Sequence, residues 1–498
     1  MQTRREFLKR TGAVAAGMAL GGLECLAADS GRKPNVIFVF ADQLRAQALG
    51  CYGDKQAVTP NIDRLASQGA RFTNAISTWP VCSPFRAMLM TGCYPMTNGV
   101  VYNDLPIWDG QTCIADALKA QGYATGYIGK WHLSGGIPDR LPGRRLGFDY
   151  WEPSQVEMIS TSADGKQTWR PEVQTDKAVE YIKSNKDKPF CLFMSWNPPH
   201  NPYIAPDRYM KSFEKDKMEF RTNVAERALV DEQLEKHPTD EASGPTPKRA
   251  KWRKDLDSDD GVREILWGYY SATHGLDVLV GRIMKTLDDL GIADDTILVF
   301  SSDHGDMLGS HRMCLKQEPF EESISIPFIV RYPKRIPKGT VTDALLSPID
   351  IMPTLLSLAG APVPKSVEGI SLDQAALGKR SDQQDAVLIM KMQPGGGPWV
   401  CNAATPWRGV RTKTHTYARL EYDGPWILFD NKNDPYQMKN LIGDPAHKKL
   451  QDEMEATMQK LLKKANDPFD SGKIKQQIAR RSRTNLRMKP REARGEEE

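Results

Sequence analysis

The sequence predicts an α/β protein: a mostly parallel β-sheet sandwiched by helices, with a smaller C-terminal subdomain built on an antiparallel sheet. Three observations carry this prediction. Uniformly apolar runs, typical of strands buried on both faces, span residues 35–40, 124–128, 190–194 and 296–300. Amphipathic stretches lie between these runs at residues 59–69, 109–122 and 274–291, so that strands alternate with helices. From about residue 382, short strands follow one another with only turns between them.

Length and composition bound the class of protein. The chain has 498 residues, of which 40% are hydrophobic and 26% charged. This excludes a disordered chain, a collagen-like fibre and a polytopic membrane protein, and the length favours two structural units. The net charge of +4 comes from the two ends, because residues 1–27 carry +2 and residues 471–498 carry +5. The stretch between them has a net charge of −3, so we do not expect nucleic acid as a partner.

Residues 1–27 resemble a cleavable twin-arginine signal peptide. The pair Arg4-Arg5 precedes a Gly- and Ala-rich apolar run over residues 11–23, and small residues follow it. This run is shorter than the about 20 apolar residues that a membrane-spanning helix needs, so no membrane span is expected. An amphipathic N-terminal helix is the alternative, but four glycines disfavour it. The prediction implies Tat export machinery, a periplasmic or extracellular location, and no disulfide framework.

Charged and metal-binding side chains follow four of the predicted strands. They are Asp42, Lys130, His132, His200, Asp303 and His304. Ligands of parallel α/β sheets bind beyond the carboxyl ends of the strands, so we expect these side chains to lie together. Two carboxylates suit a hard divalent cation, and the nearby cationic groups suit a substrate with negative oxygens.

The segment Cys82-Ser83-Pro84-Phe85-Arg86, followed by a short apolar stretch and Thr91-Gly92, is the most specific motif. Read alone, it fits equally well a buried cysteine before a helix that begins at a proline. Further motifs occur in a consistent order at residues 59–65, 129–132 and 303–306 and at Lys316. Over residues 35–360 the pattern resembles the type I, formylglycine-dependent sulfatases of the alkaline phosphatase superfamily. The resemblance implies an alkaline phosphatase-like fold.

The resemblance also implies that Cys82 is oxidised to formylglycine by a formylglycine-generating or radical maturation enzyme. The hydrated aldehyde would be a geminal diol, one oxygen of which attacks sulfur while the other later expels sulfate. Pro84 suits the first turn of a helix, which would place the nucleophile at a helix N-terminus. Phe85 departs from the small residue that the family often has there.

By resemblance, one divalent cation would be held by Asp42, Gln43, Asp303 and His304, with the formylglycine from Cys82 completing the shell. Oxygen ligands favour Ca²⁺, with Mg²⁺ as the alternative. Gln43 stands where many relatives have a second acidic residue, and His304 where many have Asn. The histidine also admits a transition metal.

The remaining roles follow from the same resemblance. Lys130 and Lys316 would grip the sulfate oxygens, and Arg86 would hold the formylglycine. His132 would take a proton from the spare hydroxyl group. His200 would donate a proton to the departing alcohol, an effect typically worth about 10²–10⁴ in rate.

The predicted domain organisation has four parts. The signal peptide comes first, and a catalytic domain spans residues 33–381, with a charged insertion at 211–260 that is partly helical over 224–236. The C-terminal subdomain at 382–470 contains strands near 386–390, 407–412, 416–420 and 426–430, a glycine-rich loop at 393–398 and a helix over 445–465. The basic tail at 471–498 is predicted to be disordered.

The function expected from this resemblance is hydrolysis of a sulfate monoester on a sulfated small molecule or glycan, with a carbohydrate favoured by analogy with exported relatives. His311 is a candidate substrate contact. One alternative is a formylglycine-dependent phosphonate monoester or phosphodiester hydrolase. Another is a non-catalytic binder of sulfated glycans, which would require a lost nucleophile or metal set.

Overall fold

The computed structural model of the chain describes residues 32–134, 145–153, 159–162, 165, 167–225, 256, 258–379, 384–392 and 405–487. Residues from Pro34 onwards form one compact unit. The predicted signal peptide, the insertion over 226–255 and the loop at 393–398 lie outside the described residues. A search of the described residues finds no helix with the length and hydropathy needed to cross a membrane.

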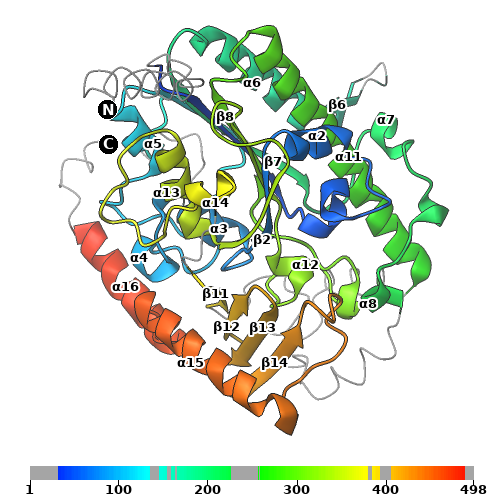
Figure 1. Ribbon diagram of the computed structural model, residues 1–498, viewed down its shortest axis with the longest axis vertical. Helices are drawn as coiled ribbons and strands as arrows, with labels where there is room; N and C mark the ends of the chain where they lie inside the picture. The colour runs from blue at the N-terminus through cyan, green and yellow to red at the C-terminus, as the bar shows by residue number, and fades with distance from the viewer. Residues whose placement is uncertain are drawn as a thin grey trace, which may run out of the picture. The chain divides into compact units, whose positions relative to one another are not determined.

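An eight-stranded sheet runs through the larger part of this unit (Figure 1). Its strands lie in the order β10-β2-β9-β8-β1-β7-β3-β4. Their bounds are β1 Asn35–Asp42, β2 Ala70–Ala75, β3 Ala124–Gly129, β4 Tyr150–Pro153, β7 Phe190–Pro199, β8 Thr296–Ser302, β9 Phe328–Arg331 and β10 Thr340–Leu346. All neighbouring pairs are parallel except those of β9, which runs antiparallel to β2 and β8. The predicted mostly parallel sheet is confirmed.

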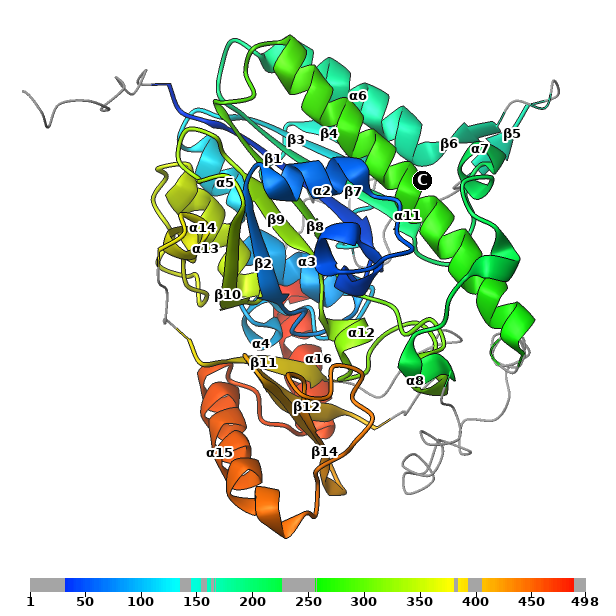
Figure 2. The ribbon, with the colours of Figure 1, turned by 45° about the vertical axis from the view of Figure 1, so that its right-hand side comes forward.

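Helices cover both faces of this sheet, which explains why the central strands are apolar throughout (Figure 2). On one face, Val36 and Phe38 of β1 pack with α3 (Cys82–Thr91), α5 (Ile114–Lys119), α13 (Pro348–Leu358) and α14 (Asp373–Ala376). On the other face, Ile37 and Val39 pack with α2 (Pro60–Ser67), α6 (Arg170–Asn185) and α11 (Asp259–Asp289). Successive side chains of a strand point to opposite faces, so β1 contributes to both cores.

Two predicted helices differ in extent from those observed. The helix expected over 274–291 is the second half of α11, a helix of 31 residues. Its first half continues the buried apolar pattern through Val262, Ile265 and Tyr269, and Ser258 caps its N-terminus by accepting from the Gly261 amide. The helix expected over 109–122 is confined to α5.

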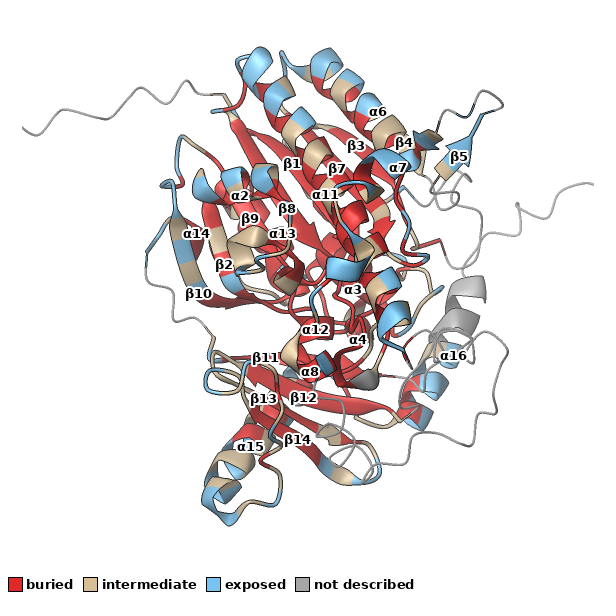
Figure 3. Cartoon of the chain, turned by 90° about the vertical axis from the view of Figure 1, so that its right-hand side faces the viewer, coloured by how far each residue is buried: buried red, intermediate tan, exposed pale blue. Residues whose placement is uncertain are grey.

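A second, four-stranded sheet forms the C-terminal subdomain, as predicted. Its antiparallel strands follow chain order: β11 (Ala386–Lys391), β12 (Trp407–Thr412), β13 (His415–Leu420) and β14 (Gly424–Asp430). Met454 and Met458 of α15 (Lys448–Lys464) pack on one face, and Phe320 packs on the other, beside α12 (Glu321–Ile324) (Figure 3). A buried ion pair between Arg411 of β12 and Glu321, at 2.7 Å, joins this subdomain to α12.

The prediction of a disordered tail is wrong for residues 471–487, which form α16 (Ser471–Arg487). Low apolar content favoured disorder, but Ile474 is fully buried and Ile478 packs beside it against the core of the C-terminal subdomain. Residues four positions apart lie on the same face of a helix, so Ile474 and Ile478 both face this core.

The described part of the charged insertion contains α8 (Thr222–Ala225), and α7 (Asp207–Met210) precedes it. The helix expected over 224–236 otherwise lies outside the described residues. The antiparallel strands β5 (Ile159–Thr161) and β6 (Gln167–Trp169) form a small hairpin. The short helix α4 (Pro95–Asn98) follows α3. Cys314 is disulfide-bonded, whereas Cys82 and Cys191 are free thiols.

Candidate active site

Cys82 is the first residue of α3, as the motif predicted, and its side chain is almost fully buried. Pro84 lies in the first turn, where its missing N–H leaves no intrahelical hydrogen bond unmade. The Cys82 Sγ atom lies 3.3 Å from His304 Nε2, 3.6 Å from Asp42 Oδ1 and 3.6 Å from Lys130 Nζ. The thiol therefore stands at a helix N-terminus among groups from three strand ends.

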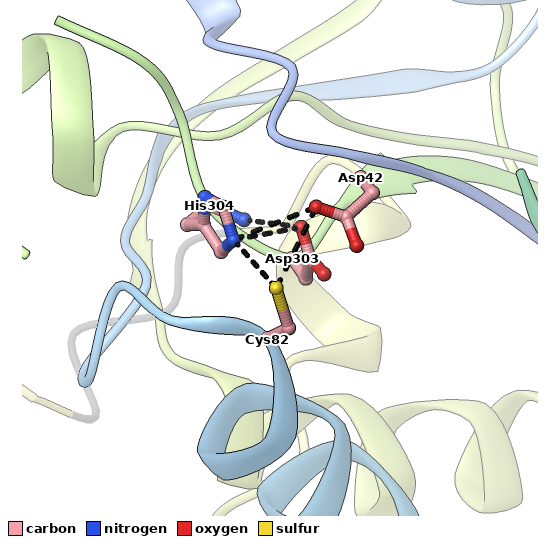
Figure 4. Close-up of side chains that lie close together, drawn as sticks. All are labelled: Asp42, Cys82, Asp303 and His304. Carbon is pink, nitrogen blue, oxygen red and sulfur yellow. Dashed lines mark hydrogen bonds and ion pairs between the residues drawn. The ribbon is translucent and has the colours of Figure 1, made fainter. Parts of the chain in front are cut away.

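Four of the predicted metal ligands converge on one point. Ligand atoms of Asp42, Cys82, Asp303 and His304 all lie within 4.8 Å of one another, and all four residues are buried (Figure 4). Asp42 ends β1, whereas Asp303 and His304 follow β8, the parallel neighbour of β1. The carboxyl ends of adjacent parallel strands thus bring together residues about 260 positions apart in the chain.

The orientation of the His304 ring fits a metal ligand. Its Nδ1 lies 3.0 Å from the Gly305 carbonyl oxygen, which can only accept, so Nδ1 carries the proton. Nε2, which lies toward Cys82, is then the nitrogen that can bind a cation. Burial would lower the pKa of His304, but Asp303 and Cys82 raise it above its ordinary value. A hydrogen bond from the second ring nitrogen is how metal-binding histidines are usually held. Two carboxylates, one imidazole nitrogen and the Cys82 position form a donor set that fits a divalent cation.

Arg86 lies beside this cluster, and its side chain is fully buried. Nη2 donates to Asp42 at 3.0 Å and to Asp303 at 2.9 Å. Nη1 donates to the Lys130 carbonyl at 2.6 Å and to Ser195 Oγ at 2.8 Å. Burial alone would lower the pKa of Arg86, but Asp303 and Asp42 raise it, so the guanidinium stays charged.

Lys130 reaches the same cluster from the end of β3. Its Nζ lies 2.5 Å from Asp42 Oδ2. Burial opposes the charged form, but Asp42 and Cys82 raise the pKa of Lys130 above its ordinary value. In turn, burial would raise the pKa of the Cys82 thiol, but Lys130, Lys316 and His304 lower it well below the ordinary value. The site therefore stabilises negative charge at the Cys82 position.

His132 faces Cys82 from a backbone conformation that few non-glycine residues adopt, with φ 60°. Its Nε2 lies 2.9 Å from Asp104 Oδ1, and Asp104 also has a positive φ, of 63°. Ser83 Oγ donates to the His132 carbonyl at 2.6 Å, which ties this loop to α3. Burial lowers the pKa of His132, but Asp104 and Cys82 raise it above its ordinary value.

His200 and Lys316 form a pair at the same site. The Lys316 ammonium lies 2.8 Å from His200 Nε2. His200 Nδ1 lies 2.8 Å from the Asn201 carbonyl, so Nδ1 holds the proton and Nε2 accepts from Lys316. Burial and the Lys316 charge lower the pKa of His200, so its ring is neutral here at pH 7. The Gln43 amide oxygen also accepts from Lys316.

His311 has different surroundings from the other predicted site residues. Its ring stacks on Phe320, with ring centroids 4.2 Å apart. Its Nε2 lies 3.1 Å from Asn223 Nδ2, and the side chain is almost fully buried. These contacts give His311 a packing role, and its proposed substrate contact stays a prediction.

Four further residues complete the site, and the sequence did not single out any of them for a role. They are Ser83, Asp104, Ser195 and Asp306. Asp306 belongs to the motif at 303–306, and Ser83 follows the cysteine directly. Asp104 and Ser195 belong to no motif, and only the fold brings them to the site.

Comparison with known proteins agrees with this geometry. A family model described as Sulfatase matches residues 34–361, and one described as N-sulphoglucosamine sulphohydrolase, C-terminal, matches residues 309–464. An ulvan-active sulfatase from Formosa agariphila is 35% identical over 463 residues, which cover 89% of this chain and 84% of the relative. The chain belongs to the sulfatase family. The resemblance to type I sulfatases of the alkaline phosphatase superfamily is thereby confirmed.

Solved structures resemble this chain over most of its length. The yidJ sulfatase candidate of Bacteroides fragilis superposes with a TM-score of 0.71 at 33% identity, covering 89% of this chain and 99% of that one. A protein solved in complex with its substrate, D-glucosamine-2-N,6-O-disulfate, has a TM-score of 0.72 at 26% identity. The match covers 88% of this chain and 99% of the solved chain. This sulfatase therefore has the architecture of enzymes that hydrolyse sulfate esters, and membership of the family implies a metal ion and a formylglycine.

Proposed function

We propose that this sulfatase removes sulfate from a carbohydrate by means of a formylglycine made from Cys82 and a single divalent cation. The observation that carries the proposal is the buried convergence of Asp42, Cys82, Asp303 and His304 at a helix N-terminus. The relative that acts on ulvan and the structure that contains a sulfated glucosamine support a sugar sulfate as the substrate.

The donor set supports Ca²⁺, because Asp42 and Asp303 offer hard oxygen atoms; Mg²⁺ is the alternative. When bound, the cation supplies Lewis-acid stabilisation, and the formylglycine supplies an activated nucleophile. Arg86 holds both carboxylates and fixes their direction. The charges of Lys130 and Lys316 both act on the Cys82 position, where they would bind the sulfate oxygens and stabilise negative charge in the transition state.

Two histidines would move protons near Cys82. His132, held by Asp104 through Nε2, would accept a proton at its Nδ1 atom. The proton shared between Lys316 Nζ and His200 Nε2 would pass to the oxygen of the departing alcohol. This refines the role of His200: it acts together with Lys316, because its ring is neutral in the free enzyme.

The remaining parts of the proposal concern maturation and export. A formylglycine-generating or radical maturation enzyme would act on Cys82, and the Arg4-Arg5 signal would direct the chain through the Tat machinery to the periplasm or beyond. Intact-peptide mass spectrometry should find the Cys82 peptide about 18 Da lighter than its thiol form, the difference between CH₂SH and CHO. Fully active protein that contains only cysteine at this position would refute the mechanism.

One screen tests the substrate class. The matured enzyme is incubated with defined sulfated mono- and disaccharides, a phosphodiester and a phosphonate monoester, and released sulfate or phosphorus product is measured. Cys82→Ala is the matched control for background hydrolysis. Turnover of a sugar sulfate that is absent in Cys82→Ala supports the proposal. Turnover confined to the phosphorus esters would instead support the phosphonate or phosphodiester hydrolase.

A further inference from the structure

A cavity of about 710 Å³ lies between α4 of the catalytic domain and the C-terminal helix α16, which are neighbours in the fold (Figure 1). This volume is within the range of pockets that bind small ligands. Three lining residues come from the catalytic domain and three from the C-terminal end of the chain: Met96, Thr97, Gln111, Asn466, Gln477 and Arg480. We call this cavity the α4–α16 groove. It shares no residue with the active site.

Polar groups that suit a sulfated sugar line the α4–α16 groove. Gln111, Asn466 and Gln477 carry carboxamides, which both donate and accept hydrogen bonds, as the hydroxyl groups of a sugar do. Arg480 carries a guanidinium, whose planar fork of donors matches the oxygens of a sulfate group. None of the six lining residues is acidic, so the lining itself does not repel a sulfate.

Both walls of the groove are held by contacts to the rest of the fold. Gln111 Nε2 donates to the Thr97 carbonyl at 3.2 Å, which joins the two residues of one wall. On the other wall, Asn466 directly precedes Asp467, which is buried and binds Arg408 at 2.5 Å and 3.1 Å. A groove whose walls are already ordered loses less conformational entropy when a ligand binds.

The helix that forms one wall is strongly basic. The 17 residues of α16 include two lysines and four arginines but no aspartate or glutamate, which gives a charge of +6. Residues 28–470 carry a net charge of −3, so the positive charge of the chain is concentrated on this helix. A sulfated polysaccharide is a polyanion, and its attraction is therefore directed to the helix beside the groove.

The apolar face of α16 is not available to a membrane. Ile474 is fully buried, and Ile478 packs beside it on the core of the C-terminal subdomain. An amphipathic helix that binds a lipid bilayer inserts its apolar face, which here is already covered. Lys473, Gln477 and Arg480 follow the spacing i, i+4, i+7 and form a separate, exposed stripe. This stripe favours a polyanion in solution over a lipid surface.

We propose that the α4–α16 groove is a second, non-catalytic site that binds sulfated polysaccharide and holds the polymer while the active site acts on one of its sulfate esters. A polymer held at the groove is kept at a high effective concentration near the active site, so the groove lowers KM for a polymer. The ligand class rests on the proposed function, because a sulfated polymer is a substrate only if the enzyme removes sulfate from carbohydrate.

Arg480→Gln tests the groove, and Lys475→Gln is its matched control. Both substitutions remove one positive charge from α16, but Lys475 does not line the groove and stands on a different side of the helix from Lys473. Calorimetry with short dextran sulfate on Cys82→Ala protein should give about tenfold weaker binding for Arg480→Gln, because a charge-assisted contact is lost. For Lys475→Gln we expect less than about threefold. All variants share one active site, so differences between them report the groove.

A second groove variant leaves the charge unchanged. Gln477→Ala should weaken the binding of dextran sulfate about fivefold, because the hydrogen bonds of one amide are lost. An unchanged affinity for Gln477→Ala, or equal losses for Arg480→Gln and Lys475→Gln, would overturn the groove, because either result would show that only the overall charge of α16 matters. Melting temperatures of all variants verify that they are folded.

Two further ligands test the class of polymer. Unsulfated dextran has the same sugar backbone and should not bind measurably, because Arg480 and the basic helix then have no charge to bind. Double-stranded DNA, supplied at the same concentration of negative charge, should bind at least about tenfold more weakly than dextran sulfate. Binding of DNA as tight as that of dextran sulfate would overturn a site for sulfated sugars and favour a nucleic-acid surface.

Kinetics separate this proposal from the proposed function. On a sulfated polysaccharide, Arg480→Gln should raise KM about tenfold and leave kcat within about twofold, whereas both constants should be unchanged on a sulfated monosaccharide. Wild type without activity on any sulfate ester would defeat the proposed function, and the calorimetry would still decide whether the groove binds. Active wild type whose binding of dextran sulfate is the same in every groove variant, or whose activity is confined to monosaccharides, would defeat the groove alone.

Discussion

Replacing Arg86 by methionine should destabilise the protein strongly, and the loss should depend on the metal ion. The side chain is fully buried, and its guanidinium holds Asp42 and Asp303 and stacks 4.8 Å from the centre of the Phe40 ring. Methionine keeps much of the buried volume but leaves both carboxylates without this partner. Removing one partner of a buried ion pair typically costs about 3–5 kcal/mol, which is the loss in unfolding free energy that we expect in chelator.

Bound cation should reduce this loss. The Arg86 charge repels a divalent ion held by the same two carboxylates, so the variant should bind the ion more tightly than the wild type. Each tenfold gain in affinity returns about 1.4 kcal/mol of stability when the ion is in excess. Urea unfolding curves give the unfolding free energy of each variant from the midpoint and the slope. Curves in EDTA measure the loss without the ion, and curves in Ca²⁺ measure how much stability the ion returns.

Arg408 provides a matched control far along the chain. It is also fully buried, pairs with Asp467 at 2.5 Å and 3.1 Å, donates to the Lys391 carbonyl at 2.6 Å and stacks on Phe469. Arg408→Met should lose a comparable unfolding free energy that is the same in EDTA and in Ca²⁺. If the unfolding free energy lost by Arg86→Met is also the same in EDTA and in Ca²⁺, Asp42 and Asp303 do not hold the metal and the reasoning fails.

Three further predictions follow from the site and the core. Asp303→Ala should reduce turnover by at least about 10³-fold and reduce bound metal in elemental analysis, because a principal ligand is lost; full metal content would contradict its role. His200→Ala should reduce kcat/KM far more for a sugar sulfate than for nitrophenyl sulfate, whose leaving group needs little protonation, and equal losses would remove His200 from proton transfer. Burial raises the pKa of Asp277 from its ordinary 3.8 to about 6, despite hydrogen bonds from Asn61 and Ile62. The folded state therefore favours the protonated acid, and the stability it confers is complete below pH 3.8 and lost as the pH rises through about 6. The unfolding free energy from urea curves should fall between about pH 4 and pH 7 by up to about 3 kcal/mol relative to Asp277→Asn, and parallel pH profiles would refute this.

The main architecture could be read from the sequence because its central strands are buried on both faces. Residues 36–40 are apolar at every position, since Phe38 packs on one layer of helices and Val39 on the other. Two edge strands, β10 and β4, could not be predicted in this way, because they are not buried on both faces. β10 alternates half-buried and exposed positions in its first half, and β4 is only half-buried along its length, so neither gives a continuous apolar run.

The sequence by itself determined the family, the position of Cys82 at a helix start and most of the charged groups of the site, because these are local motifs in a fixed order. Only the tertiary structure decided how they are connected. It brought Asp104 to His132, Ser195 to Arg86, and Asp306 to the Gln43 amide. Such contacts join loops that are distant along the chain, and hydrogen-bond direction depends on which atoms face each other. Neither property leaves a periodicity or a motif in the sequence, so the partners of a catalytic group become visible only once the strands are laid side by side.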